Sequence, residues 1–228
     1  MGNFSDIDGI IFDMDGVIFD SERLGLQSWL EVGGRHGLEG VEENARKCIG
    51  RSTKDSMEIL EAAYGDRVSI AELYKEAQLA FSELMEKNGM PLKKGAVTLL
   101  KWLRENNIKT ALASSTSVMT VRKELDEAGL LEYFSVIVGG DMIERSKPQP
   151  DIYLLACDRL GVRPEKTFAV EDSYNGILAA YRAGMLPLLV PDLIEPNSEM
   201  LEMSACSFND LEEALDWLKT TGIGPERT

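Results

Sequence analysis

The chain contains five short apolar runs, and each is followed by polar residues. They cover residues 7–12, 109–113, 136–138, 167–170 and 186–190. Several of them are rich in β-branched side chains, and runs of this length and composition are typical of buried strands. We therefore predict five strands in these places.

The segments between most of these runs show helical periodicity, with apolar residues three or four positions apart. Examples are Ala96, Leu99, Leu100 and Leu103, then Val121, Leu125 and Ala128, and later Ile152, Leu155 and Leu160. Alternating strands and helices predict an α/β fold, a Rossmann-like doubly wound parallel sheet covered by helices on both faces. Ligands of such sheets bind beyond the carboxyl ends of the strands, so residues that directly follow a strand are candidates for the functional site.

The alternation fails after the first strand, where no convincing strand occurs from about residue 21 to residue 87. Helical stretches are expected at 24–32, 52–63 and 70–85, with breaks at Gly33-Gly34, Gly50 and Gly65. We predict an α-helical domain over residues 19–88, inserted into an α/β domain formed by residues 1–18 and 89–228. Its two adjacent connections could serve as a hinge, which is typical of a lid over the strand ends.

Composition narrows the function classes. The chain has 228 residues, 44% of them hydrophobic, and a formal net charge of -15 from 39 acidic and 24 basic side chains. This charge argues against nucleic acid as a partner, and an anionic substrate would need a local cation. Cys48, Cys157 and Cys206 are isolated and are expected to be buried reduced thiols, while the single His36 makes His-rich metal sites improbable.

No run approaches the roughly 18 apolar residues of a membrane span. We expect a soluble, cytoplasmic protein that acts on a small molecule, with no membrane partner, and no obligate protein partner is evident.

Asp13 and Asp15 directly follow the first predicted strand, and Gly16 allows a sharp turn of the backbone there. Two carboxylates two positions apart can converge on one small space. By itself the pattern also fits a calcium loop or a simple turn, although the further acids that a calcium loop needs are missing.

Hydroxyl groups follow the second strand at Ser114 and Ser115. Together with the backbone N–H groups of the helix that starts there, they are natural contacts for a phosphate. For Ser115 and Ser117 a helix N-cap is an equally good interpretation. Ser114 is the stronger candidate because it ends the strand.

The third and fourth strands are followed by Lys147-Pro148 and by Glu171-Asp172. A lysine alone is usually a solvated surface group, but a site with several carboxylates and a phosphate needs a cation. Glu171 and Asp172 could complete a site for Mg²⁺, which prefers oxygen ligands.

Electrostatics explains why these groups belong together. Two unit charges about 4 Å apart interact by roughly 4 kcal/mol at an effective dielectric near 20, so a carboxylate meets a barrier when it approaches a phosphate dianion. A divalent cation and Lys147 would offset that barrier. Asp13 could then attack phosphorus to give an aspartyl-phosphate, and Asp15 could protonate the leaving oxygen and later deprotonate water.

Taken in order, Asp13-Met14-Asp15-Gly16, Ser114, Lys147-Pro148 and Glu171-Asp172 resemble the four motifs of the haloacid dehalogenase superfamily. The match spans essentially the whole chain, and the helical insert resembles the small helical cap domain of that family. The resemblance implies that Asp13 is the nucleophile and a magnesium ligand, and that Asp15 is the acid/base and binds the metal through its backbone carbonyl. It also assigns the motif serine to Ser114, the charge-balancing lysine to Lys147 and the acidic metal ligands to Glu171 and Asp172, with Asp172 the more direct one.

Within this superfamily the chain is most similar to sugar-phosphate phosphatases and β-phosphoglucomutases. Asp20-Ser21-Glu22 resembles the start of the cap in many phosphatases, and Gly50-Arg51-Ser52 resembles the cap loop that faces the active site. The resemblance thus makes Glu22, Arg51 and Ser52 candidates for substrate binding, and Ser115 is a further candidate from its place after the second strand. For Glu22 and Arg51 a solvated helix charge is the alternative interpretation.

We expect a magnesium-dependent phosphatase for a small phosphorylated metabolite, such as a sugar phosphate. A β-phosphoglucomutase-like phosphomutase is the alternative, although Gly25 occupies the position of the mutase histidine and the asparagine that mutases carry beyond the motif serine is missing. A binding module that has lost catalysis is a third possibility, but the catalytic positions are all retained.

Overall fold

The computed structural model describes residues 4, 6–49 and 53–223. Its contacts divide the chain into two compact units, Met1–Phe19 with Leu92–Thr228, and Asp20–Pro91. We call the first the α/β unit and the second the helical unit, and describe each separately.

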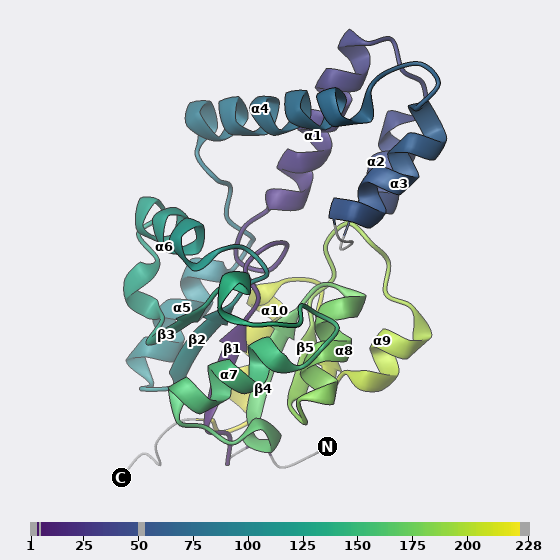
Figure 1. Cartoon of the computed structure of the whole chain (residues 1–228). Helices are drawn as coiled ribbons and strands as arrows, with labels where there is room; N and C mark the ends of the chain where they lie inside the picture. The colour runs from purple at the N-terminus through teal and green to yellow at the C-terminus, as the bar shows by residue number, and fades with distance from the viewer. Residues whose placement is uncertain (1–3, 5, 50–52, 224–228) are drawn as a thin grey trace. The chain divides into compact units, whose positions relative to one another are not determined.

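Within the described residues of the α/β unit, six parallel strands form a sheet in the order β3-β2-β1-β4-β5-β6 (Figure 1). Their bounds are β1 Gly9–Phe12, β2 Lys109–Ala113, β3 Val136–Val138, β4 Thr167–Glu171, β5 Leu186–Leu189 and β6 Cys206–Ser207. The first five correspond to the predicted strands, and the parallel pairing confirms the predicted α/β fold class.

Strand β1 lies in the middle of the sheet and pairs with β2 on one side and β4 on the other. Phe12, its last residue, is level with Leu112 of β2 and Val170 of β4. The chain segments that leave these three strands therefore start at the same edge of the sheet. This register is what brings Asp13, Ser114 and Glu171 together.

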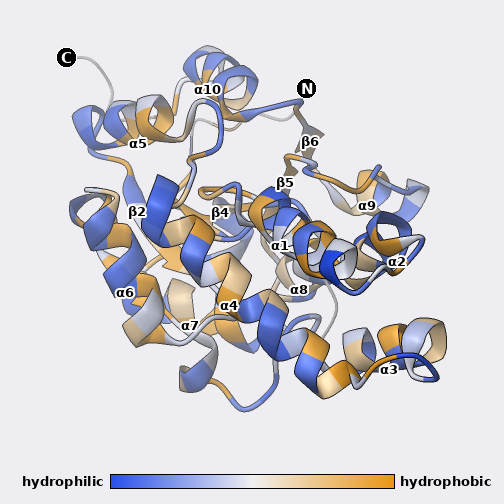
Figure 2. Ribbon diagram, turned by 90° about the horizontal axis from the view of Figure 1, so that it is seen from above, coloured by the Kyte–Doolittle hydropathy of each residue, from blue (hydrophilic) through white to orange (hydrophobic). Residues whose placement is uncertain are grey.

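Helices cover the sheet and pack on it through apolar side chains. Their bounds are α5 Ala96–Glu105, α6 Val118–Glu127, α7 Asp151–Leu160, α8 Tyr174–Arg182, α9 Ser198–Met203 and α10 Leu211–Thr220. The described part of this unit also contains the short 3-10 helices η1 Leu131–Tyr133, η2 Gly140–Met142 and η3 Pro164–Lys166. Coloured by hydropathy, helices such as α5 and α6 carry both polar and apolar segments, as amphipathic helices do (Figure 2).

The two faces of the sheet bury different side chains. On one face, Ala169 of β4 belongs to a core that includes residues of α7 and α8. Its neighbour Phe168 points to the other face, where its ring packs against Trp217 of α10, because successive side chains of a strand alternate. Apolar residues on both faces explain why the strands appear as continuous apolar runs in the sequence.

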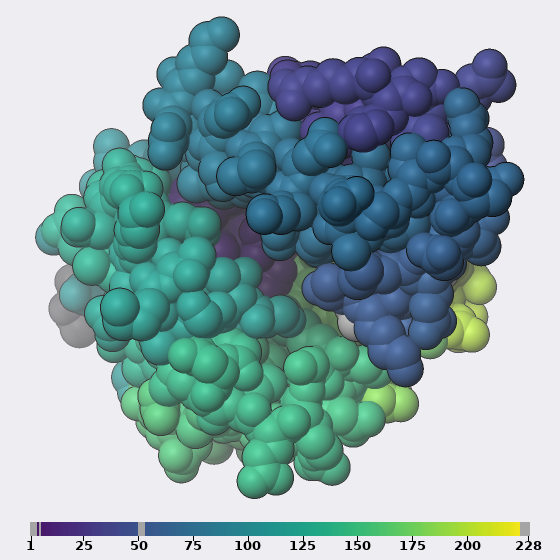
Figure 3. All heavy atoms as spheres, turned by 45° about the horizontal axis from the view of Figure 1, so that its top comes forward, coloured from purple at the N-terminus to yellow at the C-terminus, as the bar shows by residue number. Residues whose placement is uncertain are grey.

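Four helices make up the described part of the helical unit: α1 Ser21–Arg35, α2 Val41–Cys48, α3 Thr53–Tyr64 and α4 Ile70–Asn88. They enclose a small apolar core of their own, which includes Val32, Leu60, Leu73 and Ala77. In Figure 3 the indigo surface of α1 adjoins the blue surface of later helices of the same unit. The two connections of this unit run side by side, since Asp20 N donates to Pro91 O at 2.8 Å.

The predicted helix break at Gly33-Gly34 is wrong, because α1 continues to Arg35. A Cβ atom on Gly33 would lie 2.4 Å from Cγ2 of Val41 at the start of α2. The absence of a side chain at Gly33 therefore allows α2 to pack closely against α1. This glycine is needed for the contact between the two helices and does not end α1.

Three smaller expectations can be compared with the structure. Strand β6 was not predicted, because its two residues are too short to give a pattern. The cysteines form no disulfide, but Cys48 and Cys206 are half-buried and only Cys157 is buried as expected. Among the described residues no helix is long and apolar enough to cross a membrane.

Candidate active site

The turn after β1 places Asp13 and Asp15 at the edge of the sheet. Asp13 N donates to Val170 O of β4 at 3.0 Å, which continues the strand pairing by one residue. Gly16 has a φ of 76°, and a Cβ atom there would lie 2.1 Å from Oδ2 of Asp172. Only glycine fits this position, both for its left-handed backbone and for the close approach of Asp172.

Lys147 joins the ends of two strands with its ammonium group. Its Nζ donates to Oδ1 of Asp13 at 2.6 Å and to Oε1 of Glu171 at 2.6 Å. The side chains are nearly closed off from solvent, with 8% of Lys147, 11% of Asp13 and none of Glu171 exposed. The sequence predicted a lysine near several acids. The structure adds that the ammonium group is buried and lies between two carboxylates.

Burial and mutual charge shift the protonation equilibria of this group. Burial raises the pKa of Asp13 to about 8, the ammonium group of Lys147 opposes this rise, and the carboxylates of Glu171 and Asp15 add to it. Burial disfavours the charge of Lys147, but the carboxylates of Asp13 and Glu171 outweigh that effect and raise its pKa. Asp13 thus depends on a further positive charge to be fully ionised at neutral pH.

The acidic residues fit a hard divalent cation. One carboxylate oxygen from each of Asp13, Glu171 and Asp172 lies within 4.8 Å of the others, and all three residues are largely buried. Buried carboxylate oxygens that converge in this way are the donor set that Mg²⁺ prefers. These three residues are therefore the candidate magnesium site, to which the family resemblance adds the Asp15 backbone carbonyl as a prediction.

The segment after β2 contributes hydroxyl groups to the same edge. Ser114 is fully buried, and its Oγ accepts a hydrogen bond from Thr116 N at 3.0 Å. Oγ1 of Thr116 donates to Oδ2 of Asp15 at 3.4 Å, so this segment touches the candidate acid/base. Ser115 is exposed, and Ser117 is the N-cap of α6, as one of the two interpretations predicted.

Tyr153 is a site residue that sequence reasoning missed. It lies on α7, is fully buried, and its hydroxyl donates to Oε1 of Glu171 at 2.6 Å. Its ring lies beneath the Lys147 ammonium group, 5.1 Å from Nζ to the ring centroid, within the range of a cation–π interaction. In the sequence Tyr153 belongs to an apolar helix face, and nothing there distinguishes it from an ordinary core residue.

We expect the substitution Tyr153→Phe to lower kcat by about tenfold, since a hydrogen bond to a charged group contributes roughly 1.5 kcal/mol or more. The phenyl ring keeps the cation–π contact, but Glu171 loses one donor and holds Lys147 less firmly. KM for the phosphate ester should change little, because Tyr153 is a positioning residue that acts through Glu171. Steady-state kinetics on wild-type protein and variant measure both constants.

Tyr181→Phe on α8 is the matched control for this substitution, because Tyr181 is 56% exposed. Its kcat should equal that of the wild type. The effect of Tyr153→Phe should also shrink when Glu171 is already replaced by glutamine. Additive losses in that double variant would contradict a role exerted through Glu171.

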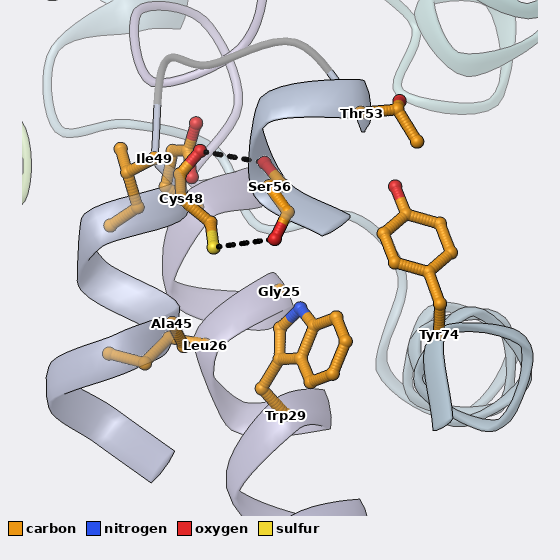
Figure 4. A pocket seen from close by; sticks show the side chains of 10 residues that line it. Gly25, Leu26, Trp29, Ala45, Cys48, Ile49, Thr53, Ser56 and Tyr74 are labelled. Atoms are coloured by element: carbon orange, nitrogen blue, oxygen red, sulfur yellow. Dashed lines mark hydrogen bonds between the residues drawn. The ribbon is translucent and has the colours of Figure 1, made fainter. Parts of the chain in front are cut away.

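The sequence also assigned substrate contacts to the helical unit. Glu22 is half-buried on α1 and lines a pocket within that unit (Figure 4). Arg51 and Ser52 lie outside the described residues. For Glu22, Arg51, Ser52 and Ser115 the substrate-binding role stays a prediction.

Fold and site together define a class of protein. A doubly wound parallel sheet carries an aspartate at the end of its central strand, a buried lysine that contacts this aspartate, and two further acids at the end of the neighbouring strand. This arrangement is suited to nucleophilic attack by a carboxylate on a phosphorus centre assisted by a divalent cation.

Residues 10–190 match the haloacid dehalogenase-like hydrolase family. The chain belongs to this family, which confirms the resemblance seen in the four motifs. The match spans the four motifs of the candidate site as well as the helical unit.

Several phosphatases are similar in sequence to this chain. The chain is 33% identical over 218 residues to the phosphorylated carbohydrates phosphatase of Thermotoga maritima, covering 93% of this chain and 99% of that protein. It is 30% identical over 180 residues to the validoxylamine A 7'-phosphate phosphatase of Streptomyces hygroscopicus subsp. limoneus, covering 79% and 80%. The crystal structure of a HAD family hydrolase from Deinococcus radiodurans R1 with bound phosphate and sodium superimposes with a TM-score of 0.81 at 27% identity, covering 96% of this chain and 97% of that one.

Proposed function

We propose that this protein is a magnesium-dependent phosphatase that hydrolyses a small phosphorylated metabolite, a sugar phosphate, through an aspartyl-phosphate on Asp13. The observation that carries the proposal is the buried contact of Lys147 with Asp13 and Glu171, at 2.6 Å each, beside Asp172. The names of the two phosphatase relatives and the phosphate bound in the Deinococcus structure support it.

Asp13 is the nucleophile in this proposal. Lys147 holds one oxygen of its carboxylate, so the side chain points in a fixed direction when it attacks phosphorus. The bond between phosphorus and the ester oxygen breaks as the new bond to Asp13 forms. Magnesium, when bound by Asp13, the Asp15 backbone, Asp172 and Glu171, neutralises phosphate charge and favours the ionised form of Asp13.

Asp15 moves the protons of both half-reactions. Its carboxyl group gives a proton to the departing ester oxygen and then accepts a proton from the water that attacks the aspartyl-phosphate. Thr116, which donates to Oδ2 of Asp15, orients this carboxyl group. Ser114 and the backbone N–H groups at the start of α6 are the proposed contacts of the phosphate oxygens.

A panel of phosphate esters, each assayed for release of inorganic phosphate with Mg²⁺ and with a chelator, tests this function. We expect hydrolysis of sugar monophosphates that requires Mg²⁺. β-Glucose 1-phosphate should yield glucose and phosphate, whereas its conversion to glucose 6-phosphate would favour the β-phosphoglucomutase-like alternative. A protein that releases no phosphate from any ester would contradict the proposal.

A further inference from the structure

An ion pair is buried in the α/β unit outside the candidate site. Nζ of Lys93 lies 2.6 Å from Oδ1 of Asp192, and only 14% of the Lys93 side chain and 1% of the Asp192 side chain are exposed. Other ion pairs of this unit lie nearer the surface, such as that of Lys94 with Asp210, whose side chains are 66% and 25% exposed. No step of the mechanism above uses Lys93 or Asp192.

Burial gives this pair an energetic cost. Two charges lose hydration free energy when they leave water, and their mutual attraction repays that loss only in part, so a buried ion pair is weak evidence for added stability. In some proteins buried polar pairs select one arrangement of chain segments over its alternatives. The backbone contacts of Lys93 and Asp192 indicate which arrangement this pair selects.

The backbone of Lys93 pairs with the chain that leaves the candidate site. Lys93 N donates to Ile18 O at 2.9 Å, and the preceding Leu92 forms an antiparallel bridge with Phe19. Ile18 and Phe19 are fully buried. An anchor on the side chain of Lys93 therefore also holds this short ladder in place.

Phe19 closes the turn that carries Asp15. We call residues 14–19 the Asp15 turn. Phe19 forms a parallel bridge with Asp15, its carbonyl oxygen accepts from Gly16 N at 2.9 Å, and its N–H donates to Met14 O at 3.0 Å. The backbone of Asp15 is thus tied to Phe19 and, through the ladder, to Lys93.

Asp192 belongs to the segment that leaves β5 at the same edge of the sheet. Val190, two residues earlier, donates from its N–H to Glu171 O at 2.8 Å. The carboxylate of Glu171 accepts from Lys147, which also holds Asp13. The ion pair therefore connects the Asp15 turn to the strand ends that carry the nucleophile and the acids.

The Asp15 carboxyl group needs an accurately placed turn. Its contact with Oγ1 of Thr116 is 3.4 Å long, whereas O–H···O hydrogen bonds are usually about 2.5–3.0 Å, so this contact restrains the group only loosely. Proton transfer requires about 2.6–3.2 Å between the two heavy atoms. A misplacement of about 1 Å can lower a rate by roughly 100-fold.

We propose that Lys93 and Asp192 are positioning residues for Asp15, because their ion pair holds the Asp15 turn where its carboxyl group reaches the departing ester oxygen. The inference rests on the proposed function, since it concerns the proton that Asp15 gives in that reaction. All residues in this chain of contacts belong to the α/β unit.

Three variants remove the pair in different ways. Asp192→Asn keeps the shape of the side chain and removes one charge. Lys93→Met keeps the length of the side chain but leaves the carboxylate of Asp192 buried without its cation, and the double variant Lys93→Met/Asp192→Asn avoids that cost. Lys94→Met is the matched control, because the neighbouring lysine pairs with Asp210 at the surface.

The experiment measures the first half-reaction of the full chain with Mg²⁺ in single turnovers. p-Nitrophenyl phosphate has a leaving group that departs without a proton, whereas the alkoxide of a sugar monophosphate needs one. We expect the double variant to release the sugar about tenfold more slowly than the wild type and p-nitrophenol within about twofold of it. Asp192→Asn should slow sugar release severalfold.

KM for the sugar monophosphate should change little in these variants, because the proposed role concerns proton transfer and not substrate binding. A normal rate with p-nitrophenyl phosphate also shows that a variant is folded. Lys94→Met should equal the wild type with both esters. The inference is overturned if Asp192→Asn and the double variant release the sugar at the wild-type rate, if both esters are slowed equally, or if Lys94→Met slows sugar release as much.

Asp15→Asn separates this inference from the proposed function. Without its general acid, the protein should release the sugar about 100-fold more slowly or worse, with a much smaller effect on p-nitrophenol. If Asp15→Asn slows neither ester, the proposed role of Asp15 fails first. If Asp15→Asn discriminates between the esters and the variants of the ion pair do not, only the role of Lys93 and Asp192 is wrong.

Discussion

Asp13→Asn is expected to abolish phosphate release, with kcat lowered by about 10⁴-fold or more, because it removes the atom that attacks phosphorus. Asparagine has nearly the same shape as aspartate, so the fold should persist. Its amide is a poor nucleophile and carries no charge. Release of inorganic phosphate from acetyl phosphate and from sugar monophosphates, followed over hours, measures the residual rate.

Asp8→Asn is the matched control for this prediction. Asp8 lies just before β1, at the opposite end of the strand from Asp13, and pairs with Arg163 at 2.8 Å on the surface. Loss of an exposed ion pair has little effect on stability and should have none on kcat. Turnover by Asp13→Asn at more than about one hundredth of the wild-type rate would show that Asp13 is not the nucleophile.

The aspartyl-phosphate itself can be observed. When Asp15 is replaced by asparagine, the second half-reaction lacks its proton acceptor, and phosphorylated protein should accumulate with a reactive donor such as acetyl phosphate. Mass spectrometry then detects the added phosphoryl group, and its absence after the further change Asp13→Asn assigns it to Asp13.

Removal of Mg²⁺ is expected to have the second-largest effect, a loss of about 100-fold or more in turnover. Asp13 and Glu171 share the ammonium group of Lys147, and Asp172 adds a third carboxylate to the same cluster, so its ionised form brings three negative charges together. Its repulsion of a phosphate dianion amounts to several kcal/mol at an effective dielectric near 20. Burial also leaves Asp13 with a pKa of about 8, so part of the protein holds a protonated nucleophile without the cation.

Dialysis against a chelator, followed by assays with and without added Mg²⁺, measures this dependence. Added Mg²⁺ should restore the rate, and it should also raise the unfolding temperature of the wild-type protein, because a ligand of the folded state stabilises it. Asp172→Asn should lose most of that thermal shift. Full turnover after exhaustive chelation would count against a magnesium site.

Much of the fold could be predicted from the sequence, for a physical reason. A strand buried on both faces takes apolar residues at most positions, so β1 is an apolar run, and β2 and β4 carry apolar residues between polar ends. Two residues cannot produce such a pattern, and β6 was therefore missed. The break expected at Gly33 was wrong because its cause, the approach of Val41, lies outside the local sequence.

In the candidate site, too, some residues could be predicted from the local sequence and others could not. Asp13, Ser114, Lys147 and Glu171 could be selected because each follows a strand and carries a reactive or charged group. Tyr153 and the contact of Thr116 with Asp15 could not be selected, because both depend on partners that are distant in the chain. Tyr153 donates to Glu171, 18 residues away, and Thr116 to Asp15, 101 residues away.

By itself, the sequence determined that this chain has an α/β sheet with a helical insertion and a set of acids and one lysine at the ends of its strands. Local patterns of apolar residues and the order of the motifs suffice for that. Only the tertiary structure decided that Lys147 is shared between Asp13 and Glu171, that Gly16 lies against Asp172 and that Lys93 pairs with Asp192. The reason is that each of these contacts joins segments far apart in the chain, and the distance between such segments is set by packing rather than by local pattern.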